Sequence, residues 1–255
     1  MMIGWQNRFD SAILSSTSEI STLPAAYAQH PHLSRKWHTA AGVKSAGLII
    51  DFGLSLSAAL LGVMGTNLTS TATMQLRSSD IDPTVTTNLE YDSGSIAAGV
   101  KDGYGAIYKS FTSTNSRYWR LDLADASVIS NLQIGRVYLG PYWQPGINME
   151  LDWSVTPLDE SRMARSYGGQ SYPDARPKRR VLQFTLDFQT EVDMYDNAFA
   201  LARVHGIVGD ILAIPDIAGT YVSEQSVWGQ LATSEPISEP RLGLFRQRYA
   251  VVERL

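Results

Sequence analysis

Short apolar runs alternate with polar turns along most of this chain. Leu48–Phe52 and Ala58–Gly65 are mainly apolar and predict buried strands, and Ala72–Arg77 alternates apolar and polar residues as a half-buried strand does. Strand signals recur about every ten residues, the spacing that a β-sandwich or jelly roll produces. The later predicted strands are Ala106–Phe111, Tyr118–Leu123, Leu132–Leu139, Met149–Trp153, Val181–Phe188, Ile211–Ile214 and Phe245–Val252.

One segment has a helical period instead. Thr190 and Asp193 have the spacing of a capping box, and Gly206 is placed where a helix C-terminus favours glycine. Between them, apolar residues form a stripe at helical spacing: Met194, Ala198, Leu201 and Ala202. The pattern therefore predicts a mainly β chain with one α-helix at about residues 190–205.

Three polar stretches interrupt this pattern. Residues 1–34 predict an extended N-terminal arm lying on the body, and residues 80–103 predict a long surface excursion. A basic, glycine-bearing loop, residues 162–180, lies between the predicted strands Met149–Trp153 and Val181–Phe188. The plan is a jelly-roll β-sandwich over residues 35–141, followed by a β-rich C-terminal extension over residues 142–255. Whether the extension is a separate domain or continues the sandwich stays open.

Composition narrows the classes of function. Apolar residues make up 44% and charged residues 18%, which is ordinary for a globular protein with a sizeable core. The chain has no cysteine, so disulfides, thiolate metal sites and cysteine nucleophiles are excluded. With 21 basic and 25 acidic residues, the net charge is −4, which argues against nucleic-acid binding. No run reaches the about 18 apolar residues of a membrane helix, and the N-terminus lacks the order of a signal peptide. We expect the chain either to fold in the cytoplasm where it is made or to leave by a route other than signal-directed secretion.

A search for catalytic chemistry finds no phosphate loop, nucleophile elbow, dinucleotide fingerprint or zinc-protease motif. His30, His32 and His38 cluster near the N-terminus, but no further metal ligand lies near them, so polar surface residues are the expected role. Three carboxylates flank Trp153 and leave a sugar-cleaving site open as an alternative to a solvated turn: Asp152, Asp159 and Glu160. We expect the protein to have no enzymatic activity and to bind neither a metal nor a cofactor.

Aromatic residues near the predicted loop edges are candidates for a different role. Tyr and Trp rings pack against the C–H faces of sugars and offer polar atoms at the rim, and they are also enriched in interfaces. The candidates for glycan contact, with a place in the core or in a subunit interface as the alternatives, are Tyr104, Tyr108, Tyr138, Tyr142 and Trp143.

The predicted loop at residues 162–180 concentrates positive charge. Arginine forks bind carboxylates in a bidentate way, and the acidic chain offers carboxylates on an adjacent subunit. We therefore predict a subunit interface, with a solvated loop and polyanion binding as the alternatives. The candidates are Arg162, Arg165, Arg176, Lys178, Arg179 and Arg180.

The order of turn and strand positions also resembles a known family. Over residues 35–141 it is similar to the galactose-binding-like (discoidin-type) jelly roll. The motifs that carry this resemblance are Asp51-x-Gly53, Gly65-x-Asn67, Arg77-x-Ser79, Arg117-Tyr118-Trp119-Arg120-Leu121 and Ile134-Gly135-Arg136-Val137-x-Leu139-Gly140.

A second resemblance extends to about residue 217. It is to structural proteins of tailed bacteriophages, particularly components of the tail tip or baseplate. Its motifs are Tyr167-Gly168-Gly169-Gln170-x-Tyr172, Arg179-Arg180 and Ile214-Pro215-Asp216.

Together the resemblances imply a structural virion protein of a phage tail, made in the host cytoplasm, that acts by protein–protein assembly. Its implied partners are other tail proteins or copies of itself, with host surface polysaccharide as a further contact. The alternative is a free-standing carbohydrate-binding module or a lectin-like receptor-binding protein. We expect neither nucleic-acid binding nor membrane insertion.

Overall fold

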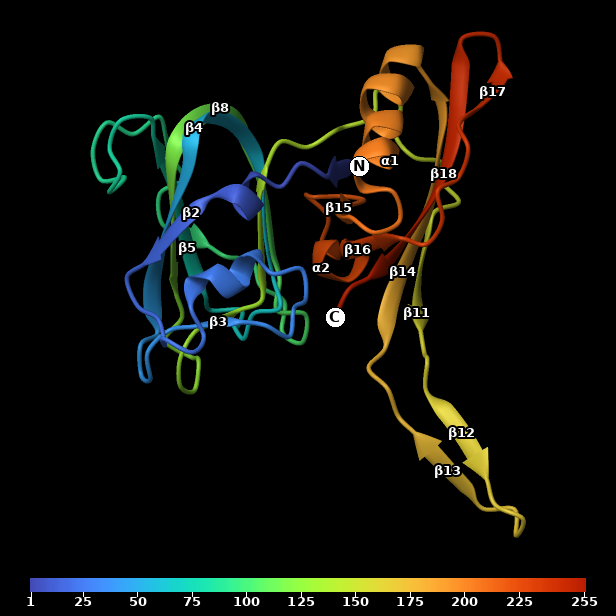
Figure 1. Cartoon of the computed structure of the whole chain (residues 1–255), viewed down its shortest axis with the longest axis horizontal. Helices are drawn as coiled ribbons and strands as arrows, with labels where there is room; N and C mark the ends of the chain where they lie inside the picture. Colours follow the sequence, from blue (N-terminus) through green and yellow to red (C-terminus); the bar gives the residue numbers. More distant parts are fainter. The chain divides into compact units, whose positions relative to one another are not determined.

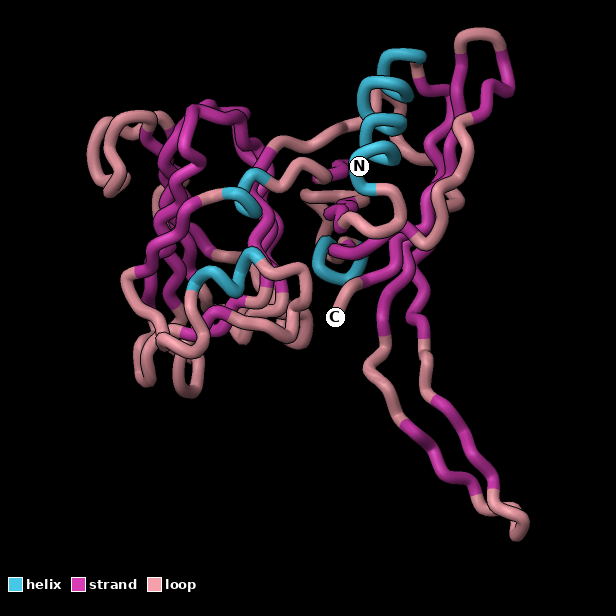
Figure 2. Tube along the Cα trace, viewed as in Figure 1, coloured by secondary structure: helices cyan, strands magenta, loops and turns pink.

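The computed structural model describes all residues, 1–255, and is 45% strand and 11% helix, so the predicted mainly β class is confirmed. The chain divides into two compact units. The sandwich unit contains Met2–Gln144 and Ile214–Ser226. The sheet unit contains Met1, Pro145–Ala213 and Val227–Leu255. Figures 1 and 2 show the strands and helices of each unit.

The sandwich unit is built on two long antiparallel strands, β4 (Ser45–Met64) and β8 (Ile107–Ala124). Their pairing runs from Ser45↔Ala124 to Val63↔Ile107, with a register shift in the middle of each strand. Because both strands bend at these shifts, each contributes to both layers of the sandwich. Two pairs of predicted strands are therefore two continuous strands.

Gly53 explains why β4 continues where the sequence predicts a break. Its φ is +78°, a conformation that favours glycine, and it lies in the shift between Asp51 and Leu56. Residues 52–55 form a bulge at the bend instead of a turn. A glycine after an apolar run is compatible with a bulge inside one strand and with the end of a strand. The prediction of two separate strands was therefore wrong here.

Shorter strands complete the two layers. β10 (Arg136–Gly140) pairs with the second half of β4, and β2 (Ile13–Ser16) pairs with its first half. β5 (Thr73–Ser79) pairs with β8. The remaining elements of this unit are β1 (Met2–Gly4), β3 (Trp37–His38), β6 (Tyr91–Asp92), β7 (Ile96–Ala97), β9 (Gln133–Ile134), α2 (Val222–Gln225) and the 3-10 helices Arg8–Ser11 and Ala25–Gln29.

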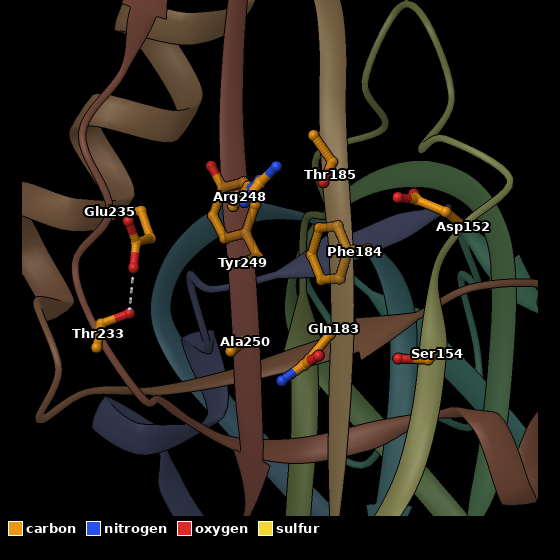
Figure 3. A pocket seen from close by; sticks show the side chains of 10 residues that line it. All are labelled: Asp152, Ser154, Gln183, Phe184, Thr185, Thr233, Glu235, Arg248, Tyr249 and Ala250. Atoms are coloured by element: carbon orange, nitrogen blue, oxygen red, sulfur yellow. Dashed lines mark hydrogen bonds between the residues drawn. The ribbon is translucent and has the colours of Figure 1, made fainter.

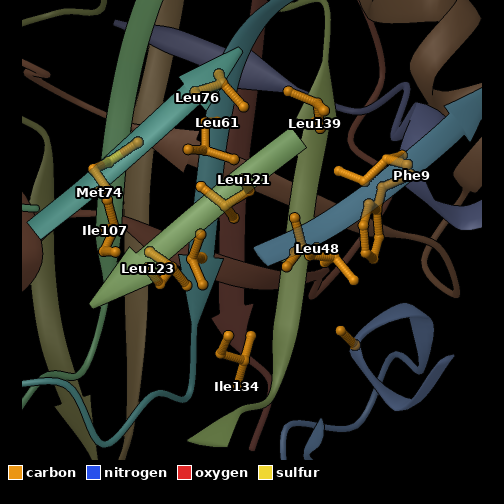
Figure 4. Packing of buried hydrophobic residues seen from close by; sticks show 14 of the residues in the cluster. Phe9, Leu48, Leu61, Met74, Leu76, Ile107, Leu121, Leu123, Ile134 and Leu139 are labelled. Atoms are coloured by element: carbon orange, nitrogen blue, oxygen red, sulfur yellow. The ribbon is translucent and has the colours of Figure 1, made fainter. Parts of the chain in front are cut away.

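The core of this unit lies between the two layers and is shown in Figure 4. Leu48, Leu61 and Leu121 are fully buried there. Phe9 belongs to the same core, and the side-chain amide of Gln29 donates hydrogen bonds to the carbonyls of Phe9 and Ala12. Residues 2–34 therefore belong to the sandwich unit, where they form short strands and 3-10 helices that pack on its core, and they are not the extended arm that their polar composition predicts.

The sheet unit is an antiparallel sheet with the strand order β15-β16-β18-β14-β11, and β17 pairs with β18. The strands are β11 (Ser154–Leu158), β14 (Arg179–Gln189), β15 (Asp210–Ile214), β16 (Val227–Leu231), β17 (Ser238–Arg241) and β18 (Leu244–Glu253).

The predicted helix is present after β14. It consists of a π-helical segment, Asp193–Phe199, that continues into α1 (Ala200–His205). Met194, Ala198 and Leu201 are all fully buried, as their stripe predicts. No helix in the protein is both long enough and apolar enough to cross a membrane.

A two-stranded hairpin extends from the sheet at the position where the sequence predicts a loop. β12 (Arg162–Arg165) and β13 (Ser171–Asp174) pair with each other, and all their residues are exposed. Residues 159–178, named the hairpin arm below, project beyond the ends of β11 and β14 (Figure 1).

Core packing in the sandwich unit generates a stability prediction. Leu121→Ala removes a fully buried side chain and leaves a cavity, so the free energy of unfolding should fall by about 2–5 kcal/mol. The matched control is Ile129→Ala, whose side chain is 99% exposed and should change it by less than about 0.5 kcal/mol. Urea unfolding measures both variants. Equal losses would contradict the assignment of Leu121 to the core.

An ion network around the buried Asp187 in the sheet unit generates a prediction about pH. The Arg246 guanidinium donates hydrogen bonds to Asp187 at 2.6 Å and to Glu150 at 3.1 Å. Burial by itself raises the pKa of Asp187, but hydrogen bonds from Arg246 and from the Phe188 N–H outweigh it and hold this pKa below its usual value.

A depressed folded-state pKa means that Asp187 stabilises the fold above its unfolded-state pKa of about 3.9, and that this stabilisation is lost as the pH falls through the folded-state pKa. Asp187→Asn should therefore be less stable than the wild type at neutral pH, and the difference should shrink below about pH 4. Urea unfolding of both proteins at neutral pH and again below about pH 4 tests this. A difference that stays constant with pH would contradict it.

Candidate functional site

The sheet unit contains a groove that crosses β11, β14 and β18, with a volume of about 370 Å³ (Figure 3). The strand register explains which side chains reach it. Ser154 pairs with Gln183, and Gln183 pairs with Ala250, so these three form one row across the sheet. Thr185 and Arg248 pair with each other and form the next row on the same face.

The groove is polar because residues on β14 and β18 alternate between the two faces of the sheet. Gln183 and Arg248 are exposed, whereas their neighbours Phe184 and Tyr249 are only 3% and 5% exposed. The rings of Phe184 and Tyr249 stack with centroids 4.9 Å apart. Alternation thus gives these two strands one face of buried rings and one face of polar side chains, and Phe184 and Tyr249 are themselves among the residues that line the groove.

Most polar side chains in the groove have no partner within the protein. They make neither a hydrogen bond nor an ion pair through their side chains: Asp152, Ser154, Gln183, Thr185 and Arg248. Glu235 differs, because its carboxylate accepts a hydrogen bond of 2.9 Å from the Thr233 hydroxyl. The groove therefore presents unused donors and acceptors from an amide, two hydroxyls, a carboxylate and a guanidinium.

Two carboxylates flank the groove. In Figure 3, Asp152 and Glu235 lie on opposite sides of the strands that carry Arg248 and Gln183. The sugar-cleaving alternative uses Asp152, Asp159 and Glu160 instead. The structure places only Asp152 in the groove, because Asp159 and Glu160 lie in the hairpin arm and form ion pairs with Lys178 and Arg179.

Burial corrects three of the aromatic candidates. Tyr138 is fully buried, and Tyr108 and Trp143 are only 7% and 5% exposed. The Tyr138 hydroxyl donates to the Pro141 carbonyl, and burial raises the pKa of this hydroxyl. These three rings pack in the interior, where a sugar cannot stack on them. Tyr104, at 41% exposed, and the half-buried Tyr142 keep an accessible ring.

The basic candidates fall into two groups. Four pair with carboxylates of the same chain: Arg176 with Asp174, Lys178 with Asp159, Arg179 with Glu160 and Arg180 with Glu253. Arg162 and Arg165, near the end of the hairpin arm, have no hydrogen-bond or ion-pair partner. The predicted subunit interface stays a prediction. Arg162 and Arg165 are the two basic candidates for it whose charges are not paired within the chain.

The histidines near the N-terminus are placed as follows. The rings of His30 and His32 lie with centroids 5.2 Å apart, and a ring nitrogen of His38 lies 3.4 Å from the Asn131 amide. No group of three or more His, Asp or Glu side chains in the protein could hold a metal ion.

Sequence reasoning missed Gln183, Glu235 and Arg248 as site residues. The polar positions within β14 and β18 are visible as alternation, but nothing local shows that residues near 152, 183 and 248 meet on one face. That information is in the strand register.

No protein-family model matches the chain, and a search of curated proteins finds no match. Among solved structures, the chain is similar to chitosan-binding module 1 of a chitosanase/glucanase from Paenibacillus sp. IK-5, with 14% identity and a TM-score of 0.44 over 53% of this chain and 99% of that one.

Module 2 of the same enzyme, solved in complex with chitotriose, is 16% identical with a TM-score of 0.44, over 53% of this chain and 100% of that one. The lectin domain of lectinolysin, solved in complex with Lewis b antigen, is 12% identical with a TM-score of 0.40, over 52% and 95%. None of these structures is that of a phage-tail protein.

Proposed function

We propose that this chain is a glycan-binding protein without catalytic activity of its own, and that the groove of the sheet unit holds the glycan. The observation that carries the proposal is the convergence of five polar side chains that have no partner within the protein. Unpartnered donors and acceptors on one rigid sheet face are prepared for a polar ligand.

Sugars suit this chemistry because each hydroxyl both donates and accepts a hydrogen bond. Asp152 accepts, Arg248 donates, and Gln183, Ser154 and Thr185 do both. The groove volume of about 370 Å³ lies within the range of small-ligand sites, about 300–1,000 Å³. A short stretch of polysaccharide, bound across the strands, is the ligand class that we propose.

A structural role in a phage tail is a second candidate, because of one separate observation. The hairpin arm is exposed along its whole length and carries the free charges of Arg162 and Arg165. Such an element supports a role in protein assembly, as the sequence resemblance implies, with the virion as the location. Both roles are compatible in one chain, since the arm and the groove are different surfaces.

The test of glycan binding is Arg248→Ala and Gln183→Ala in the full chain. A glycan array identifies a ligand, and titration calorimetry with that glycan measures the affinity. Each substitution removes a hydrogen bond that involves a polar or charged group, so each should weaken binding about tenfold.

Arg203→Ala is the matched control, because Arg203 is an exposed arginine on the helix of the same unit, outside the groove. It should bind as the wild type does. If only Tyr104→Ala weakens binding, the glycan site lies on the sandwich unit and the groove is excluded. Release of reducing ends that Asp152→Asn abolishes would make the protein an enzyme.

A further inference from the structure

The end of the hairpin arm is both basic and apolar. Met163, Tyr167 and Tyr172 are 69%, 113% and 56% exposed, and Arg162 and Arg165 are unpaired between them. The turn between the strands is closed by a hydrogen bond from the Ser166 N–H to the Gln170 carbonyl. Aromatic rings, methionine and arginine are the residues enriched at the centres of protein interfaces.

The start of the helix presents the opposite charge on a similar apolar surface. Val192, Tyr195 and Phe199 are 67%, 47% and 50% exposed, and the rings of Tyr195 and Phe199 lie 6.1 Å apart. Glu191 and Asp196 are exposed beside them and have no partner in the chain. The helix buries Met194, Ala198 and Leu201 and leaves this acidic-aromatic face uncovered.

These two surfaces cannot meet within one chain. The arm joins one end of β14, at Arg179, and the helix follows the other end, at Gln189. The 11 residues of β14 span about 36 Å at about 3.3 Å per residue. The arm from Asp159 to Ser166 adds about 26 Å at the same rise. Figure 1 shows the arm and the helix at opposite ends of the sheet unit.

We propose that the hairpin arm of one copy docks on the acidic-aromatic face of the helix in a second copy, the face formed by Glu191, Val192, Tyr195, Asp196 and Phe199. In the register of the arm, Arg162 and Tyr172 lie on one face and Arg165 and Met163 on the other. The arm therefore docks by an edge, so that the two arginines reach Glu191 and Asp196 from its two faces and the apolar side chains pack beside them. This inference is independent of the glycan-binding proposal.

A second copy is the occupant that the charges favour. Both surfaces expose large apolar side chains that a monomer in water leaves uncovered, and their free charges are opposite in sign. The contact joins two different surfaces, so it is head-to-tail and generates a ring or a filament instead of a closed dimer. An isolated two-stranded hairpin is marginally stable in water, so docking also stabilises the arm.

Charge reversal on each surface tests the contact in the full chain by sedimentation velocity over a range of concentrations. The wild type should self-associate. Arg162→Glu with Arg165→Glu should weaken association at least about tenfold, because like charges then face each other, and so should Glu191→Arg with Asp196→Arg. The combination of all four should restore association to near the wild-type level.

The matched control is Arg176→Glu with Lys178→Glu, which makes the same change of charge on the same arm at residues already paired with Asp174 and Asp159. It should associate as the wild type does, and circular dichroism should show every variant folded. A wild type that stays monomeric, or four reversals that fail to restore association, would overturn the proposal. Binding to another protein or to a polyanion, without self-association, would overturn it as well.

Discussion

The pairing of β14 with β18 is the interaction on which the functional surfaces of the sheet unit depend. It is regular from Val181↔Val252 to Leu186↔Gln247, and it shifts only near the end of β14. This register sets which residues share a face. Phe184 and Tyr249 are stacked and buried on one face, and Gln183 and Arg248 are exposed on the other. All four are among the residues that line the groove. A shift by one residue would exchange the two faces, bury the polar set and expose the rings.

The same strand separates the two surfaces proposed for assembly. β14 carries the hairpin arm at its first residue and the helix after its last. The groove lies between them, where β11 and β18 flank β14. Ligand binding and assembly can therefore use one rigid sheet without competing for the same side chains. The charged residues at the base of the arm are neutralised within the chain, which leaves only its far end electrostatically free.

Local patterns in the sequence predict the elements whose signal is local. The helix near residues 190–205 and the strand at Phe245–Val252 are present because a stripe or an alternation needs no distant partner to be recognised. Gly53 is a bulge and not a turn because of its pairing with β8, which the sequence does not display. A hairpin signal is present at Gly168 and Gly169, which lie between the strands Arg162–Arg165 and Ser171–Asp174, but the basic composition obscured it.

The groove depends on residues about a hundred positions apart in the sequence, so no local pattern shows it. Three of the aromatic candidates are in the core, because burial is a tertiary property.

The groove, and not the loops of the sandwich unit, is the surface proposed to contact the glycan. Amide hydrogen exchange of the full chain, with and without a saturating glycan, distinguishes the two surfaces. Binding in the groove should confine added protection to peptides that contain Asp152–Ser154, Gln183–Thr185 and Arg248–Ala250. Protection around Tyr104 or Tyr142, with the groove peptides unchanged, would contradict it.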